Sequence, residues 1–140
     1  MVTVNWQGAE SFESRTPSGF LLQMSSPPDE GSPTSPSPIE VFVSAAASCS
    51  GIDVISILKK MRQNVTAYRI EVEWQRGPQG VYPRPITSLI LRHVVSGENL
   101  DRASVEKAVA LSDEKYCGIL ATLRQSPAIS SEFRIEDASL

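Results

Sequence analysis

The chain contains two cysteines, Cys49 and Cys117, and a single histidine, His93, and these side chains have the types most suited to nucleophilic or metal chemistry. The three residues are scattered and lack the paired spacing of a zinc site, so no metal is expected. No motif for another chemistry lies close to His93. Any catalysis by this chain is therefore expected to depend on sulfur.

Each of these residues also has a structural interpretation. Free cysteine is among the most buried residue types, so Cys49 could serve as a small apolar side chain in a buried helix. His93 shares an apolar strand face with Leu89 and Leu91, which favours a hydrogen-bonded structural histidine. An attacking cysteine must be a thiolate, and a position in the middle of a helix places Cys49 far from a helix N-terminus. A cation from elsewhere would have to stabilise its charge.

Two carboxylates are candidate binding residues. Asp53 lies four residues after Cys49 and so shares its helix face. It could orient a neighbouring arginine, although a bare carboxylate would oppose a thiolate, and a hydrogen bond to backbone or across a dimer is an equal alternative. Glu40 lies three residues after Ser37, the pattern of a capping box, so its first role is expected to be structural.

Cys117 is expected to end a helix, where the negative end of the dipole disfavours a thiolate. This position suits a thiol that resolves an oxidised partner better than one that attacks a substrate. Lys115, two residues earlier, belongs to a helix face expected to be solvated, and it is a secondary candidate for positive charge near the sulfurs.

Composition indicates one domain spanning residues 1–140. The 140 residues are 41% hydrophobic and 21% charged, enough for a single hydrophobic core. With 13 Lys and Arg against 16 Asp and Glu, the net charge is -3, without a basic block, so neither nucleic acid nor a membrane surface is an expected partner. No signal peptide or membrane-spanning run is expected, which predicts a cytoplasmic protein without a structural disulfide.

The elements that would position these residues follow from periodicity. Short antiparallel strands are predicted near residues 2–6, 11–14 and 19–24, followed by a flexible loop rich in Pro and Ser at residues 25–38. The capping pattern starts a long helix at Pro38 that should reach about Asn64. Its first half is apolar or small on nearly every face, the composition of a buried helix.

A period of two then predicts paired strands at residues 65–75 and 86–95. A second helix is predicted from about Asp101 to Tyr116, with Ser112 on its apolar stripe, then a helical turn at 119–123 and a last strand at 133–135. This order indicates an α+β domain with helices on one face of antiparallel sheets. Because so small a domain can hardly cover an apolar helix, a homodimer is expected.

Two segments together resemble the OsmC-like family, which comprises osmotically inducible protein C and the organic hydroperoxide resistance proteins. The first runs from Ser37-Pro38 through an Ala/Ser-rich stretch to Cys49-Ser50-Gly51-Ile52-Asp53, and the second is Leu111-Ser112-Asp113-Glu114-Lys115-Tyr116-Cys117. The Cys-Ser-Gly-Ile-Asp motif is similar to that of a less characterised branch. The resemblance covers almost the whole chain.

The resemblance implies an intertwined homodimer with two active sites at the interface, each reducing organic hydroperoxides without a cofactor. Cys49 would attack the peroxide and become a sulfenic acid, Cys117 would resolve it as a disulfide, and a dithiol reductant would reset the pair. The family's helix-start glutamate corresponds to Ile39, while Glu40 lies about 100° further around the helix. For the family's early arginine the candidate is Arg15. The alternative is a dimeric module that binds a small hydrophobic ligand in its interface cleft.

Overall fold

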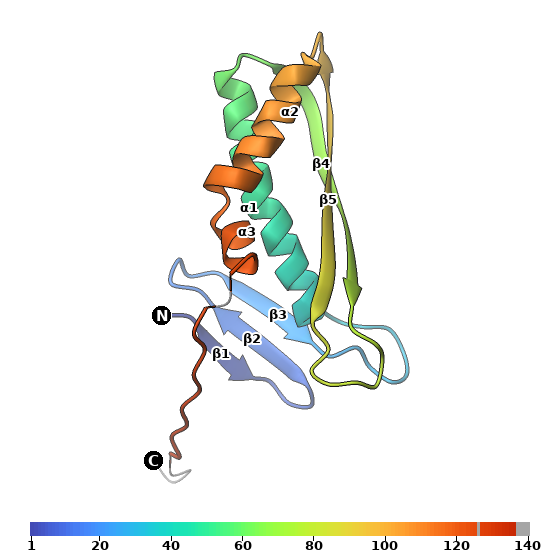
Figure 1. Ribbon diagram of the computed structural model, residues 1–140. Helices are drawn as coiled ribbons and strands as arrows, with labels where there is room; N and C mark the ends of the chain where they lie inside the picture. The colour runs from blue at the N-terminus through green and yellow to red at the C-terminus, as the bar shows by residue number, and fades with distance from the viewer. Residues whose placement is uncertain (126, 137–140) are drawn as a thin grey trace.

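The computed structural model describes residues 1–125 and 127–136. Three short strands at the start form an antiparallel meander in the order β1-β2-β3, which Figure 1 shows at the lower end of the molecule. Its strands are β1 (Thr3–Trp6), β2 (Ser11–Arg15) and β3 (Leu21–Ser25). Residues 26–37 then cross to the first helix without helix or strand. The two ends of this loop meet, because the hydroxyls of Ser25 and Ser35 lie 2.7 Å apart.

The first helix, α1 (Pro38–Lys60), begins where the capping pattern predicted. The Ser37 hydroxyl accepts from the backbone N–H of Glu40, and the Glu40 carboxylate accepts from the N–H of Ser37 at 2.7 Å. The helix ends earlier than the predicted Asn64, because Arg62 adopts a left-handed φ of 58° that stops the helical turn. This tight end lets the chain reverse at once into the following strand.

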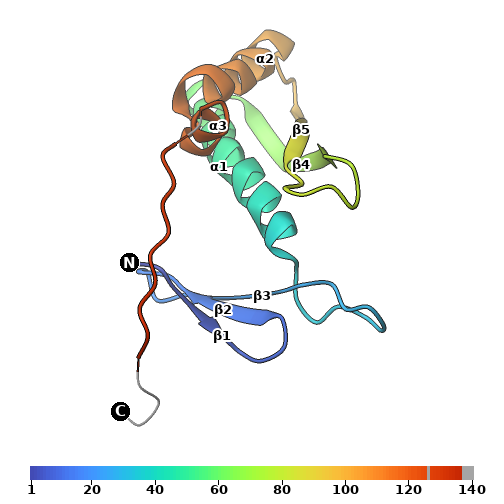
Figure 2. The same ribbon diagram turned by 60° about the horizontal axis from the view of Figure 1, so that its bottom comes forward.

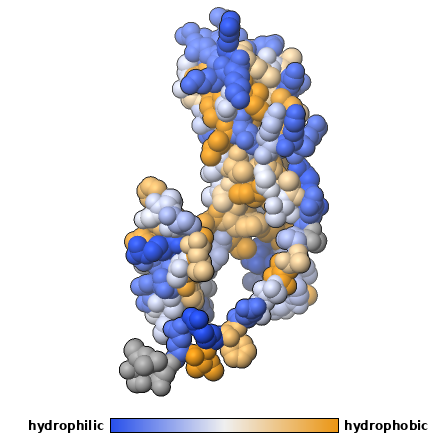
Figure 3. Space-filling model, turned by 90° about the vertical axis from the view of Figure 1, so that its left-hand side faces the viewer, coloured by the Kyte–Doolittle hydropathy of each residue, from blue (hydrophilic) through white to orange (hydrophobic). Residues whose placement is uncertain are grey.

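α1 is the central helix of the fold. Contrary to expectation, it is long and apolar enough, by length and composition alone, to cross a membrane. The same properties suit a helix that packs on several sides within one fold. One side of α1 is buried at Val54 and Leu58, whereas Phe42, Ile52 and Ile55 on other sides stay exposed. Figure 3 shows apolar side chains at the surface over the helical part of the molecule.

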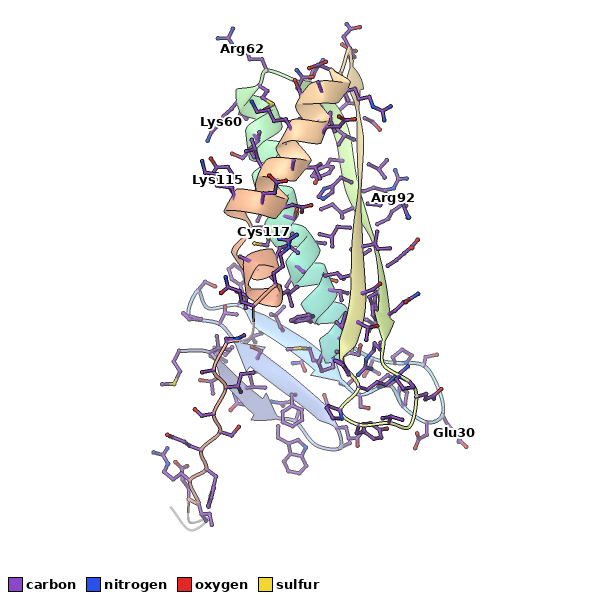
Figure 4. The ribbon with its side chains drawn as sticks, viewed as in Figure 1. Glu30, Lys60, Arg62, Arg92, Lys115 and Cys117 are labelled. Carbon is purple, nitrogen blue, oxygen red and sulfur yellow. The ribbon has the colours of Figure 1, made fainter. Side chains whose placement is uncertain are left out.

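A long two-stranded ribbon, β4 (Asn64–Arg76) and β5 (Ile86–Glu98), packs along α1. Its strands pair antiparallel, as predicted, with Ile70 opposite His93. One face turns toward α1, and the other carries a charged network in which Arg92 lies 3.1 Å from Glu73. Figure 4 shows Arg92 pointing away from the helices.

The predicted second helix is present, but its last turn is a π-helix. α2 (Arg102–Leu111) continues as η1 (Ser112–Tyr116), and a short helix, α3 (Gly118–Leu123), follows Cys117. In Figure 1, α2 runs beside α1, and both helices lie on the same side of the ribbon. The core lies between these layers and is centred on Val54, Leu58 and Ala108.

The fold is α+β, as predicted, with two antiparallel sheets, a long helix and further helices. Figure 2 shows that the N-terminal meander lies below the lower end of α1, apart from the β4–β5 ribbon, which lies beside the helix. The predicted strand at residues 133–135 is absent from the described part of the chain, where residues 127–136 run without strand pairing. Dimerisation stays a prediction.

Candidate functional site

Cys49 lies in the middle of α1 and is partly exposed. The residues around it are small: Ser50 and Gly51 follow it and are buried. Gly51 allows α1 to approach β4, because a Cβ at this position would lie 2.9 Å from Cδ1 of Ile70. This close contact between α1 and β4 sets the position of Cys49 along the β4–β5 ribbon.

Cys117 is 2% exposed and occupies the junction between η1 and α3. Cys117 ends the helical segment, as expected, because it is the C-cap of η1, and it is also the N-cap of α3. Its sulfur accepts from the backbone N–H of Leu120 at 3.5 Å. This contact favours negative charge on the sulfur and partly offsets the effect of the preceding helix end.

The two cysteines are neighbours in space although they come from separate elements. Burial is the main factor that raises the pKa of the Cys117 thiol; the Leu120 N–H opposes it, and hydrogen bonding and charge interaction with Cys49 raise it further. Both cysteines are free thiols. Figure 4 shows Cys117 on the segment between η1 and α3, beside α1. A disulfide between them would therefore join η1 and α3 directly to the central helix.

A buried polar cluster lies beside the cysteines. The hydroxyls of Ser50 and Ser112 are 3.0 Å apart, and both residues are 0% exposed. The Ser112 hydroxyl also lies 3.3 Å from Oδ2 of Asp53 and 3.3 Å from the backbone oxygen of Ser50. Asp53, expected on the Cys49 face, thus binds η1 through Ser112.

Sequence reasoning placed Ser112 on the apolar stripe of the second helix but missed its partnership with Ser50. The available signal was a hydroxyl at a position predicted to be buried in each of two packed helices. Buried hydroxyls require hydrogen-bond partners, and each serine supplies one for the other. The pairing could have been proposed on that ground.

The other candidates lie apart from the sulfurs. Glu40 forms the capping box, and the hydrogen bond from the Ser37 backbone is the main factor that lowers the pKa of its carboxyl. Arg15 is exposed on β2, and no hydrogen bond or ion pair links it to either cysteine within residues 1–125. The Lys115 ammonium lies 5.3 Å from the Tyr116 ring centroid, and Figure 4 shows the side chain at the outer edge of the helices.

His93 points into the space between the ribbon and the helices. Its Nδ1 lies 2.6 Å from the Tyr68 hydroxyl, while the buried Nε2 has no hydrogen-bond partner among the described residues. The predicted structural histidine is therefore hydrogen-bonded on only one ring nitrogen. Burial lowers the pKa of His93, and the charge of Asp113 partly opposes this effect.

An apolar groove of about 910 Å³ separates the meander from the start of α1 and the end of β4. Its wall includes Phe12, Met24, Ile39 and Trp74, with Glu40 at one side. Ile39, the position at which the resemblance implies a glutamate, contributes apolar surface to this groove. The groove lies at the meander end of α1.

Comparison with known proteins identifies relatives along nearly the whole chain. A family model described as OsmC-like protein matches residues 30–132. Protein YhfA of Escherichia coli K12 is 33% identical over 132 residues, which cover 94% of this chain and 95% of YhfA.

Solved structures show the same fold. A hypothetical protein from Aquifex aeolicus VF5 is 29% identical, covers 90% of this chain and 87% of its own, and has a TM-score of 0.77. The organic hydroperoxide resistance protein OhrB of Bacillus subtilis is 17% identical, covers 90% and 92%, and has a TM-score of 0.59. At that identity the likeness to OhrB concerns the fold.

Proposed function

The chain belongs to the OsmC-like family, and from this premise we propose that it is a dimeric, thiol-dependent peroxidase that reduces organic hydroperoxides. The observation that carries the proposal is the placement of two free thiols next to each other, one partly exposed and one buried. Support also comes from the fold shared with OhrB, whose name refers to organic hydroperoxide resistance.

The proposed chemistry has three steps. The Cys49 thiolate attacks the terminal peroxide oxygen, the O–O bond breaks, and the leaving alkoxide takes a proton to become an alcohol. The Cys117 sulfur then attacks the sulfenic acid on Cys49, the S–O bond breaks, and water leaves as the disulfide forms. An external dithiol reduces the disulfide and is itself oxidised to its own disulfide.

The assignment of roles rests on exposure and charge. Cys49 is the more accessible thiol, whereas Cys117 is 2% exposed and burial raises its pKa. A peroxide would reach Cys49 first, among the small side chains of α1. Cys117 needs only to reach the sulfur next to it.

A cation is also part of the proposal, because the thiolate and the leaving oxygen both carry negative charge. No ion pair holds the Arg15 side chain among the described residues, so its guanidinium is available for another partner. We propose that Arg15 acts at the cysteines of the dimer, where the meander of one copy lies against the helices of the other. The exposed apolar residues of α1 would be covered by the same association.

The test is hydroperoxide consumption with a dithiol such as dihydrolipoamide or dithiothreitol as reductant. Wild type should consume cumene hydroperoxide, and Cys49→Ser should lose this activity. Ser48→Ala, at the neighbouring exposed position, is the matched control and should keep it. Wild-type protein without turnover, or a Cys49→Ser variant with full turnover, would refute the peroxidase.

The 910 Å³ apolar groove favours one second candidate, a module that binds a small hydrophobic ligand. In that case the cysteines would contribute packing, and a fluorescent fatty acid would bind equally well to wild type and to Cys49→Ser. Because Trp74 lines the groove, quenching of its fluorescence by the ligand would report occupancy directly.

A further inference from the structure

Ser112 is fixed at both its side chain and its backbone. Its hydroxyl lies within 3.3 Å of Asp53 Oδ2 and 3.0 Å of the Ser50 hydroxyl, both on α1. Its backbone oxygen accepts from the N–H of Cys117 at 2.9 Å, the bond that closes the π turn. One residue therefore connects the helix that carries Cys49 to the backbone of Cys117.

The hydrogens of this cluster can be assigned by charge. A serine hydroxyl has one hydrogen to donate, and a carboxylate is the strongest of the acceptors within reach of Ser112. Ser112 then donates to Asp53, and Ser50 donates to Ser112. This order forms a continuous chain from Ser50 through Ser112 to Asp53, in which both buried hydroxyls are satisfied.

The π turn determines where Cys117 lies. A π-helix places one extra residue in a turn, is rare, and occurs often at functional sites. In an α-helical turn the Cys117 N–H would bond to the oxygen of Asp113 instead. The extra residue changes the direction in which the chain leaves η1. The π turn that contains it begins at Ser112, the residue that is hydrogen-bonded to Asp53.

We propose that Ser112 and Asp53 are positioning residues for the thiol pair: their hydrogen bond holds η1 on α1 so that the Cys117 sulfur stays next to Cys49. The proposal deepens the peroxidase function above and rests on it for its biological meaning. The step it controls is disulfide closure, in which the Cys117 sulfur displaces water from the Cys49 sulfenic acid. The hydrogen bond between Ser112 and Asp53 does not affect the first step, the attack of Cys49 on the peroxide.

The physical reason is effective concentration. Two thiols held in bonding geometry react as if each met the other at high molarity, and a loss of about 1 Å in placement can reduce the rate ~100-fold. In Ser112→Ala the Asp53 carboxylate and the Ser50 hydroxyl both lose their partner, so η1 is no longer held at that point. Cys117 should then spend less time close to Cys49, so the disulfide should form less readily.

The experiment measures the equilibrium between dithiol and disulfide forms in glutathione redox buffers, by counting free thiols. Ser112→Ala and Asp53→Ala each remove one partner of this hydrogen bond and should each weaken the disulfide, by about ten-fold in the equilibrium constant. The double variant should be no weaker than Ser112→Ala alone, because both changes break the same bond. Additive losses would overturn the proposal.

A matched control separates positioning from general stability. Asp101 caps α2 through Ser104, at 3.1 Å from its backbone N–H, and is remote from the thiols. Asp101→Ala should lower thermal stability but keep the wild-type redox equilibrium. If Asp101→Ala weakens the disulfide as much as Ser112→Ala does, or if Ser112→Ala matches wild type, the positioning role is wrong.

The redox measurement needs no peroxide, so the two proposals can fail separately. A wild type that forms the disulfide in glutathione but consumes no hydroperoxide would refute the peroxidase and leave the positioning role standing. A wild type that consumes hydroperoxide without ever forming the Cys49–Cys117 disulfide would refute the positioning role and the resolving step alone.

Discussion

The Tyr68 hydroxyl lies 2.6 Å from Nδ1 of His93 on the face of the ribbon that packs against α1. Burial raises the pKa of Tyr68 to about 12, so the phenol stays protonated over the whole physiological range. Burial is also the main factor that lowers the pKa of His93, and Asp113 opposes it. The pair is therefore a neutral hydrogen bond inside the fold.

This pair predicts a loss of stability in acid. The folded pKa of His93 lies below its unfolded value, so the unfolded chain binds the extra proton first. The free energy of unfolding should fall as pH drops below about 6.5, the unfolded value for histidine. Urea unfolding of wild type and His93→Gln between pH 5 and 7.5 checks this point, and a variant with an undiminished slope would contradict it.

Selective alkylation should identify Cys49 as the reactive thiol. Cys117 is 2% exposed, and burial raises its pKa, so it is both hidden and protonated near neutral pH. With limiting iodoacetamide at pH 7.5, peptide mass spectrometry should find the label on Cys49 before Cys117. Labelling of Cys117 first would reverse the proposed roles.

Association through α1 predicts a dimer that a charge can disrupt. Ile52 is 68% exposed on α1, and Phe42 and Ile55 on the same helix are exposed as well, so the lone chain leaves several large apolar side chains of α1 uncovered. Light scattering should show a dimer for wild type and a smaller species for Ile52→Glu. Lys59→Glu, on the exposed last turn of the same helix, serves as the control and should remain dimeric. A monomeric wild type at micromolar concentration would exclude the shared site.

The capping box predicts a measurable stability loss at the start of α1. Ser37→Ala removes the side-chain acceptor for the Glu40 N–H and should lower the free energy of unfolding by about 1 kcal/mol. Ser44→Ala on the exposed face of the same helix should change it by less than about 0.5 kcal/mol. If Glu40 acts only as a cap, hydroperoxide turnover per folded molecule should be unchanged in Ser37→Ala.

Local rules predicted those parts of the fold whose causes are local. The start of α1 depends on Ser37 and Glu40, three residues apart, and the β4–β5 pairing follows from alternation along each strand. The early end of α1 depends on the left-handed φ of Arg62. A left-handed arginine has no signature in residue type, so the helix was predicted too long.

The site was harder to predict from the sequence because its contacts join residues that are far apart along the chain. The π turn begins at Ser112, which contacts Ser50 and Asp53 on another helix, and no periodicity within α2 indicates these contacts. The role of Cys117 as the N-cap of α3 depends on the direction in which the chain leaves the π turn. The neighbouring placement of the cysteines was implied by the family resemblance rather than by spacing.

The strand pairings of this fold all join strands that are consecutive in sequence. Hairpins of this kind form within about 1–10 μs. The contact between Ser50 and Ser112 instead bridges 62 positions of the chain. During synthesis, therefore, Cys49 leaves the ribosome well before Cys117, its proposed resolving partner. If Cys49 is oxidised as proposed, a nascent chain that still lacks Cys117 should pass from sulfenic to irreversible sulfinic acid under oxidative stress, and the full chain should do so less. Mass spectrometry of stalled and completed chains would detect the difference.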